Sequence, residues 1–333
     1  MRKIGLIVLC IALIGALPLF SAGSREAAEG APVTLRFGVN GNTQSIEYYA
    51  SVVFAETLER VSGGQMRANI FPGGQLGDAA EMVTQITMNE LDIYTEPIGG
   101  AGISAIIPEL GLLEMPYVVT SLDHLKRIMD SPWGQEMLTK LSTENNIRVL
   151  GHGLFGIRQT SSNRPLNTID DFRGLRIRTP NSRAIIDWAN AVGARPTPVA
   201  FAEVYLALQT GSVDAQENPL PTIESMKFYE VQSHIALTNH VYQDRSVLFS
   251  ERRWQSLSEQ QRGWVAQASQ AFVDETIELT NKMSEDLIGY FTEQGVTITR
   301  PELAPFQRAM APAYERMERE LGKPGLISSL AQL

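Results

Sequence analysis

Short apolar segments alternate with longer helical segments along the first part of the chain. Residues 33–39, 66–71 and 91–94 have the length and side-chain branching of buried strands. Between them, residues 45–61 carry apolar side chains at helical spacing, and residues 78–89 form a second helical segment. This order of strand, helix, strand, helix and strand predicts an α/β domain with a largely parallel sheet.

A second alternation of the same kind begins near residue 147. It contains predicted strands at 148–151, 175–178 and 213–217, with predicted helices at 182–192 and 202–210. Because each alternation is long enough to form its own sheet and cover it, we expect two lobes instead of one large sheet.

One long helix is predicted after these two series. Ser258 and Gln261 have the spacing of a capping box, and no proline interrupts the segment before about Ile288. A helix of that length can bridge both lobes.

The start of the chain differs in character from the rest. Two basic residues precede an apolar run over 4–17, which a proline and small residues end. The run is shorter than the ~20 residues that cross a membrane, so we expect a signal peptide over 1–22 and a flexible leader over 23–32. Cys10 lies inside the signal, so the mature protein would contain no thiol. We expect it to reside in the periplasm.

Net charge narrows the choice of partners. The chain carries a formal charge of −9, which loss of the two basic residues in the signal would change to −11. An acidic exported protein is a poor candidate for binding nucleic acid or anionic lipid. An anionic small molecule remains possible, because arginines in a cleft determine the local field.

Signals of catalysis are weak. GHGLFG at 151–156 matches a dinucleotide fingerprint, but residues 157–162 are extended in character and cannot form the helix that the fingerprint must open. Asp170 and Asp171 have the character of turn and cap residues. We therefore expect no enzymatic activity, no cofactor and no bound metal, since no metal-ligand spacing relates His124, His152, His234 and His240.

Three polar residues lie where a ligand would be expected. Two-lobed α/β proteins bind ligands in the crevice at the carboxyl ends of their strands. Arg178, Asn218 and Arg158 each lie at or near such a predicted strand end.

Several motifs in the chain have a recognisable pattern: FPGGQLG (71–77), FGIRQT (155–160), NRPL (163–166), DFRGLRIRTPN (171–181), PTPVAF (196–201), EVYLALQTG (203–211), VDAQENP (213–219) and TNH (238–240). Together they resemble a known family, the periplasmic binding proteins of tripartite ATP-independent periplasmic (TRAP) transporters. The resemblance covers residues 33–322, and it is greatest to the family's sialic-acid binders.

The resemblance implies a two-lobed periplasmic-binding-protein-like α/β fold with mixed sheets and a long helix crossing both lobes. The lobes would be discontinuous. Lobe I would comprise 33–155 and 244–283, lobe II 156–243 and 284–322, and a C-terminal tail would follow over 323–333.

The resemblance also implies site residues. Arg178 matches the arginine that pairs with the substrate carboxylate, a role suited to a planar guanidinium fork. Arg158 matches a second cleft arginine, and Asn218 matches an amide at the same carboxylate end. Further positions match the pocket lining of sialic-acid binders: Asn40, Asn181, Phe201 and His240.

The ligand itself is less constrained. Around Ala79 and residues 96–100 the chain lacks acidic residues at the spacing of the sialic-acid binders, although Glu96 can compensate from a shifted position. This favours a smaller sugar acid, a hexuronate or an aldonate, over sialic acid or another organic acid. An exported enzyme acting on such acids is the alternative from another class. We expect a monomer that delivers its ligand to TRAP membrane permease subunits.

Overall fold

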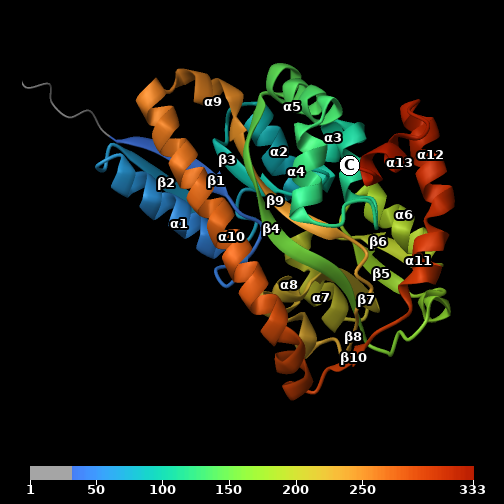
Figure 1. Ribbon diagram of the computed structural model, residues 1–333. Coiled ribbons are helices and arrows are strands. Elements are labelled where there is room, and N and C mark those ends of the chain that lie inside the picture. The colour runs from blue at the N-terminus through green and yellow to red at the C-terminus, as the bar shows by residue number, and fades with distance from the viewer. Residues whose placement is uncertain (1–31) are drawn as a thin grey trace, which may run out of the picture. The chain divides into compact units, whose positions relative to one another are not determined.

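The computed structural model describes residues 32–333, and the first predicted alternation is confirmed there (Figure 1). Strands β1 (Val33–Gly38) and β2 (Met66–Phe71) flank helix α1 (Ile46–Val61), and α2 (Ala79–Thr87) leads to β3 (Ile93–Glu96). The predicted signal peptide, its cysteine and nearly all of the predicted leader lie outside the described residues.

Side-chain caps explain where these two helices begin. The Ser45 hydroxyl accepts a hydrogen bond from the Tyr48 amide at the start of α1. Asp78 and Glu81 form a reciprocal capping box at the start of α2. These caps therefore fix the positions at which the two preceding loops end. Both loops contribute residues to the candidate functional site.

Four helical elements that the sequence analysis did not predict follow β3. An αL residue, Asn146, ends the last of them and turns the chain into β4. These elements are α3 (Ala101–Ile106), the 3₁₀ helix η1 (Pro108–Glu114), α4 (Leu122–Asp130) and α5 (Pro132–Asn145).

The second alternation is also confirmed, although its first strand is far longer than predicted. β4 runs over Ile147–Ser162, so the glycine-rich residues 151–156 lie inside a strand and open no helix. The other predicted elements are β5 (Arg176–Thr179), α6 (Arg183–Ala191), α7 (Val204–Gln209) and β7 (Ala215–Pro219). The series also contains η2 (Ile169–Phe172), β6 (Arg195–Pro198), η3 (Phe201–Glu203), α8 (Leu220–Ser225), η4 (Phe228–Glu230) and β8 (His234–Ala236).

The strands form a mixed arrangement. Within residues 32–333, ten strands connect in the order β2-β1-β3-β9-β4-β7-β5-β6, with β8 on β4 and β10 (Thr297–Thr299) on β8. β9 (Tyr242–Ser250) is antiparallel to both β3 and β4. The expectation of a largely parallel sheet is therefore wrong at the centre, because β9 returns from the second series to pair beside the first.

β4 is the strand that joins the two alternations. Residues 147–157 pair with β9, whereas residues 158–162 pair with β7 and β8. Close to the change of partner, Gly156 adopts a φ of 120°, a value open to glycine and strained for other residues. The register with β9 shifts between Leu154 and Gly156.

The predicted long helix is α10 (Glu259–Glu293), and the capping box between Ser258 and Gln261 is present. α10 packs on α1, β4 and β9 at one end and on α8 and β10 at the other (Figure 1). It therefore contacts elements of both alternations, as predicted. The short α9 (Glu251–Ser256) precedes it, and α11 (Leu303–Ala309), α12 (Ala311–Leu321) and α13 (Leu326–Ala331) follow β10.

Buried apolar side chains occur in three clusters. One lies between β1, α1, β9 and α10 and includes Phe37, Phe54 and Phe272. The largest includes Trp188, and a third includes Phe291 near the end of α10. Burial of each large side chain contributes about 1.5–3 kcal/mol, so α10 is fixed at both ends by packing. No helix among residues 32–333 has the length and apolar character that would let it cross a membrane.

Candidate ligand-binding cleft

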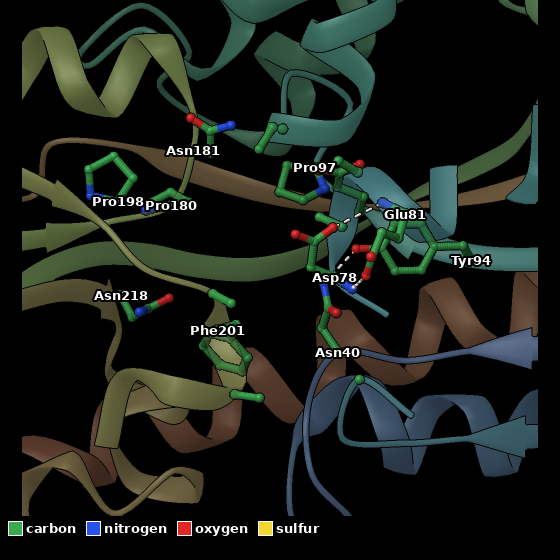
Figure 2. Close-up of a pocket in the computed structure, with 18 of the residues that line it drawn as sticks. Asn40, Asp78, Glu81, Tyr94, Pro97, Pro180, Asn181, Pro198, Phe201 and Asn218 are labelled. Carbon is green, nitrogen blue, oxygen red and sulfur yellow. Dashed lines mark hydrogen bonds between the residues drawn. The ribbon is translucent and has the colours of Figure 1, made fainter. Parts of the chain in front are cut away.

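A single cleft of about 700 Å³ contains seven of the eight predicted site residues. Its lining comes from the ends of β1, β3, β5 and β7, from the loop before α2, and from β4 and β9. Two groups of side chains face one another across it: Pro180, Asn181, Pro198, Phe201 and Asn218 on one side, and Asn40, Asp78, Glu81, Tyr94 and Pro97 on the other (Figure 2).

Arg178 is a buried cation near the end of β5. Its side chain donates from Nε and Nη2 to the carbonyl oxygen of Val199, at 3.0 and 2.7 Å. The guanidinium carbon lies 5.9 Å from the centroid of the Phe201 ring. Burial lowers the pKa of Arg178 to about 10, so the residue stays charged at neutral pH. No carboxylate among the described residues lies within ion-pair distance of it.

Arg158 is also buried, but it already has an anionic partner. Its guanidinium forms an ion pair with Glu217, with Nη2 2.7 Å from Oε1, and Nη1 donates to Gln243 at 2.8 Å. Burial raises the pKa of Glu217, but Arg158 and His240 outweigh this and bring it to about 2. Arg158 lies in the interior of β4, not near a strand end as predicted, because β4 is longer than expected.

His240 is the predicted site residue that does not line the cleft. It is fully buried and stacks on Trp188, with ring centroids 4.0 Å apart. Its Nε2 lies 2.9 Å from Oε2 of Glu217, and burial lowers its pKa. Since Oε2 of Glu217 also pairs with Nε of Arg158, His240 helps to hold the carboxylate of Glu217 in place behind the cleft.

The remaining predicted residues lie at both sides of the cleft. Asn218 donates to Gln216 at 2.7 Å, which leaves its carbonyl oxygen free of hydrogen bonds within residues 32–333. Asn181 is exposed and Phe201 is half-buried. On the facing side, Asn40 donates to the hydroxyl of Tyr94 at 2.6 Å.

Glu96 is a buried carboxyl group with one unsatisfied oxygen. Its Oε1 accepts from the amide of Gly102 at 2.8 Å, and its Oε2 has no hydrogen-bond partner among the described residues. Burial raises the pKa of Glu96 to about 8, and burial likewise raises the pKa of Glu114, also in the lining, to about 7. Glu96 is therefore largely protonated at neutral pH.

Sequence reasoning missed several lining residues. Arg245 is the most notable, because it is a third cleft arginine, located on a strand that was not predicted. The Asp244-Arg245 pair, one residue before the apolar run 247–249, was a signal for it. Others are Glu47, Asp78, Glu81, Tyr94, Glu114, Phe155 and Gln243.

The cleft has the character of a binding site for a polar anion. Within residues 32–333 no group of three or more histidine, cysteine, aspartate or glutamate side chains could hold a metal ion. Its arginines, amides and carboxyl groups converge on open space, with aromatic and proline side chains between them. Such a lining recognises a small molecule that has both a charge and hydroxyl groups.

Solved structures share this fold. A sugar acid binding protein of Advenella mimigardefordensis, solved with galactonate, is 27% identical, with a TM-score of 0.84 over 90% of this chain and 97% of that chain. A TRAP periplasmic solute binding protein of Roseobacter denitrificans, solved with L-galactonate, is 29% identical, with a TM-score of 0.82 over 90% of this chain and 98% of that one. The predicted two-lobed α/β class is thereby confirmed.

A curated relative covers almost the whole chain. It is the sialic acid-binding periplasmic protein SiaP of Vibrio cholerae, 40% identical over 310 residues, which are 93% of this chain and 96% of that protein. Relatives of this kind are not enzymes. They bind small organic acids in the periplasm and work with membrane permease subunits. The sequence profile of the bacterial extracellular solute-binding proteins of family 7 matches residues 37–320, and the chain therefore belongs to this family of TRAP-transporter binding proteins.

Proposed function

We propose that this protein captures a sugar acid with one carboxylate, a hexuronate or an aldonate, and delivers it to a TRAP permease. The observation that carries the proposal is the state of Arg178. Arg178 is a residue that is only 3% exposed, and its side chain lines the cleft and lacks an anionic partner within residues 32–333. A ligand carboxylate would supply the missing charge.

The energetics favour an acid over a neutral sugar. Burying a charge without a partner costs several kcal/mol, and a carboxylate that binds Arg178 offsets this cost. Val199 already occupies Nε and Nη2, so Nη1 is the nitrogen without a hydrogen bond among the described residues. The free carbonyl oxygen of Asn218 can accept from a ligand hydroxyl close to the carboxylate.

The other side of the cleft favours hydroxyl groups over a second carboxylate. Asp78 and Glu81 lie there, together with the largely protonated Glu96 and the amide of Asn40 (Figure 2). A hydroxyl can donate to a carboxylate and accept from an amide, whereas a second anion would be repelled. A polyhydroxylated monocarboxylate matches both sides.

The relatives support sugar acids as a class and leave one rival. Structures of relatives contain galactonate and glucuronate at 27% identity, whereas the Vibrio relative at 40% identity is named for sialic acid. Sialic acid is also a monocarboxylate with several hydroxyl groups. The absence of acidic side chains at Ala79 and at residues 97–100 favours the smaller acids.

Calorimetry with matched ligands tests the proposal. We expect glucuronate or galactonate to bind, and glucose to bind at least ~30-fold more weakly, because loss of one partner of a buried charge pair costs about 2–5 kcal/mol. A ligand present at 100 times its Kd should also raise the free energy of unfolding by ~2.7 kcal/mol.

Two outcomes would contradict it. Equal affinity for glucuronate and glucose would remove the carboxylate requirement. Tighter binding of N-acetylneuraminate than of every six-carbon acid would assign the site to sialic acid. NMR of the bound sugar acid over hours checks the enzymatic alternative, because turnover would change its spectrum whereas simple binding would not.

A further inference from the structure

A second arginine centre lies in the same cleft, away from the β5 strand that carries Arg178. Arg245 is on β9, and its side chain is 8% exposed. Its guanidinium carbon lies 3.6 Å from the centroid of the Phe155 ring, so the ring covers one face of the cation. All of these residues line the cleft.

The ion pair of Arg245 uses only one of its nitrogens. Nη1 lies 3.3 Å from Oε2 of Glu47 and donates to the carbonyl oxygen of Thr95 at 3.4 Å. Nε is buried, and neither Nε nor Nη2 forms a hydrogen bond with any of the described residues. Nε and Nη2 form one edge of the planar guanidinium, so a complete donor fork is unused.

The carboxylate of Glu47 likewise lacks part of its hydrogen bonding. Its Oε1 accepts from the backbone amide of Gly41, while Oε2 is buried without a hydrogen bond within residues 32–333 and has only the ionic contact with Arg245. A buried polar atom without a partner costs about 1–3 kcal/mol of stability. The unused atoms belong to a pair of contacting residues, Arg245 and Glu47, that both line the cleft, which points to a ligand that completes them.

We propose that Arg245 and Glu47 form a second polar subsite, which holds hydroxyl groups at the end of the sugar acid distant from its carboxylate. This inference rests on the proposed function. A hydroxyl accepts from the free fork of Arg245 and donates to Glu47, which no carboxylate can do. Glu47 also neutralises Arg245, and Asp78 and Glu81 line the same cleft, so a second ligand anion is disfavoured.

The subsite makes ligand selection depend on length and hydroxylation. Arg178 alone would accept any small carboxylate, including one of three carbons. Arg245 adds affinity only for a ligand long enough to contact both arginines. Arg245 is therefore a specificity-determining residue, and its loss should affect long and short acids differently.

The test compares galactonate with glycerate in wild-type protein and in Arg245→Gln. We expect Arg245→Gln to weaken galactonate binding roughly 10- to 100-fold and to change glycerate binding less than about threefold, because only galactonate contacts the fork. Galactarate, which has a carboxylate at each end, should bind the wild type more weakly than galactonate.

Arg148→Gln is the matched control. Arg148 also lies over an aromatic ring, 5.2 Å from the centroid of Trp254, and pairs with Glu251 at 2.7 Å, but it is outside the cleft. Its substitution should leave both affinities unchanged. If Arg245→Gln fails to fold because Glu47 is left unpaired, the double variant Glu47→Gln/Arg245→Gln removes both charges and takes its place.

The outcomes separate this inference from the proposed function. Wild-type protein that binds no sugar acid overturns both. Wild-type protein that binds galactonate, together with a variant that keeps wild-type affinity or loses galactonate and glycerate equally, overturns the second subsite alone. A preference for galactarate would assign the fork of Arg245 to a second carboxylate.

Discussion

The guanidinium of Arg178 is held by the backbone of Val199, 21 residues further along the chain, through two hydrogen bonds to one carbonyl oxygen. The carbonyl of Val199 fixes the orientation of the planar group without neutralising its charge. Lysine has no second nitrogen that could copy this arrangement. Arg178 therefore has two properties that substitutions can distinguish: its positive charge, and the fixed orientation of its guanidinium group.

Arg178→Lys should damage ligand binding nearly as much as Arg178→Ala. Lysine keeps the charge but loses the contact that orients it, and a charge-assisted hydrogen bond contributes ~1.5–3 kcal/mol. We expect a tenfold to hundredfold loss of sugar-acid affinity for Arg178→Lys and a larger loss for Arg178→Ala. Isothermal titration of the three proteins with one ligand measures both.

Arg176 provides the matched control for that experiment. It lies two residues earlier on β5, is partly exposed and pairs with Asp214 at 2.6 Å. Arg176→Ala should leave ligand affinity unchanged and have little effect on stability, as expected for an exposed ion pair. Wild-type affinity for Arg178→Ala would exclude Arg178 from the site.

The stability of the unliganded protein should fall as pH rises from neutral. Burial raises the pKa of Glu96 from 4.5 to about 8 and that of Glu114 to about 7. A raised pKa in the folded state stabilises the protein at low pH, and this contribution is lost as pH rises from 4.5 through 7 and 8. Glu217, with a lowered pKa, acts in the opposite direction only below pH 4.5.

Urea unfolding at pH 6, 7, 8 and 9 checks this direction. Each fully titrating group changes the unfolding free energy by about 1.4 kcal/mol per pH unit. Glu96→Gln should flatten the decline, because glutamine does not ionise. Glu278→Gln, at an exposed position on α10, should keep the wild-type slope. A wild-type slope for Glu96→Gln would mean that Glu96 is already ionised near neutral pH.

Local sequence signals were sufficient for much of the fold. The capping box at Ser258 and the absence of proline afterwards predicted α10, because helix starts and breaks depend on neighbouring residues. The position of Arg178 at a strand end was predicted for the same reason. The glycines at 151, 153 and 156, by contrast, break the apolar pattern of β4, so only residues 148–151 of this 16-residue strand were predicted as a strand.

Contacts between residues far apart in the sequence determine two features of the site that local sequence patterns did not predict. His240 faces the core and not the cleft, because its ring stacks on Trp188, which lies 52 positions away in the sequence. Arg245 is brought into the cleft by a strand, β9, that pairs with segments about 90 and 150 residues earlier. No local pattern contains such pairings.

Gly156→Ala should destabilise the protein by about 1–3 kcal/mol, because alanine is strained at that φ. A Cβ added there would also lie 3.1 Å from Cβ of Pro219. Gly263→Ala is the control. Gly263 lies within α10 with nothing within 4 Å of an added Cβ, so alanine should stabilise by roughly 0.5–1 kcal/mol. Thermal or urea unfolding of both variants measures the difference, and equal effects would mean that the backbone at 156 relaxes freely.

Ligand binding should bring the two lobes closer together. We propose that lobe I comprises 33–155 and 244–283 and lobe II 156–243 and 284–322, a division supported by the change of strand partner beside Gly156. Arg178 and Arg245 would then belong to different lobes, so one ligand that contacts both must draw the lobes together, with α10 as a flexible brace. Small-angle scattering should show a smaller radius of gyration at saturation with galactonate than without ligand. Glycerate, too short to contact both arginines, should produce a smaller change. A radius that stays constant at saturating galactonate would contradict closure, even if calorimetry on the same sample shows tight binding.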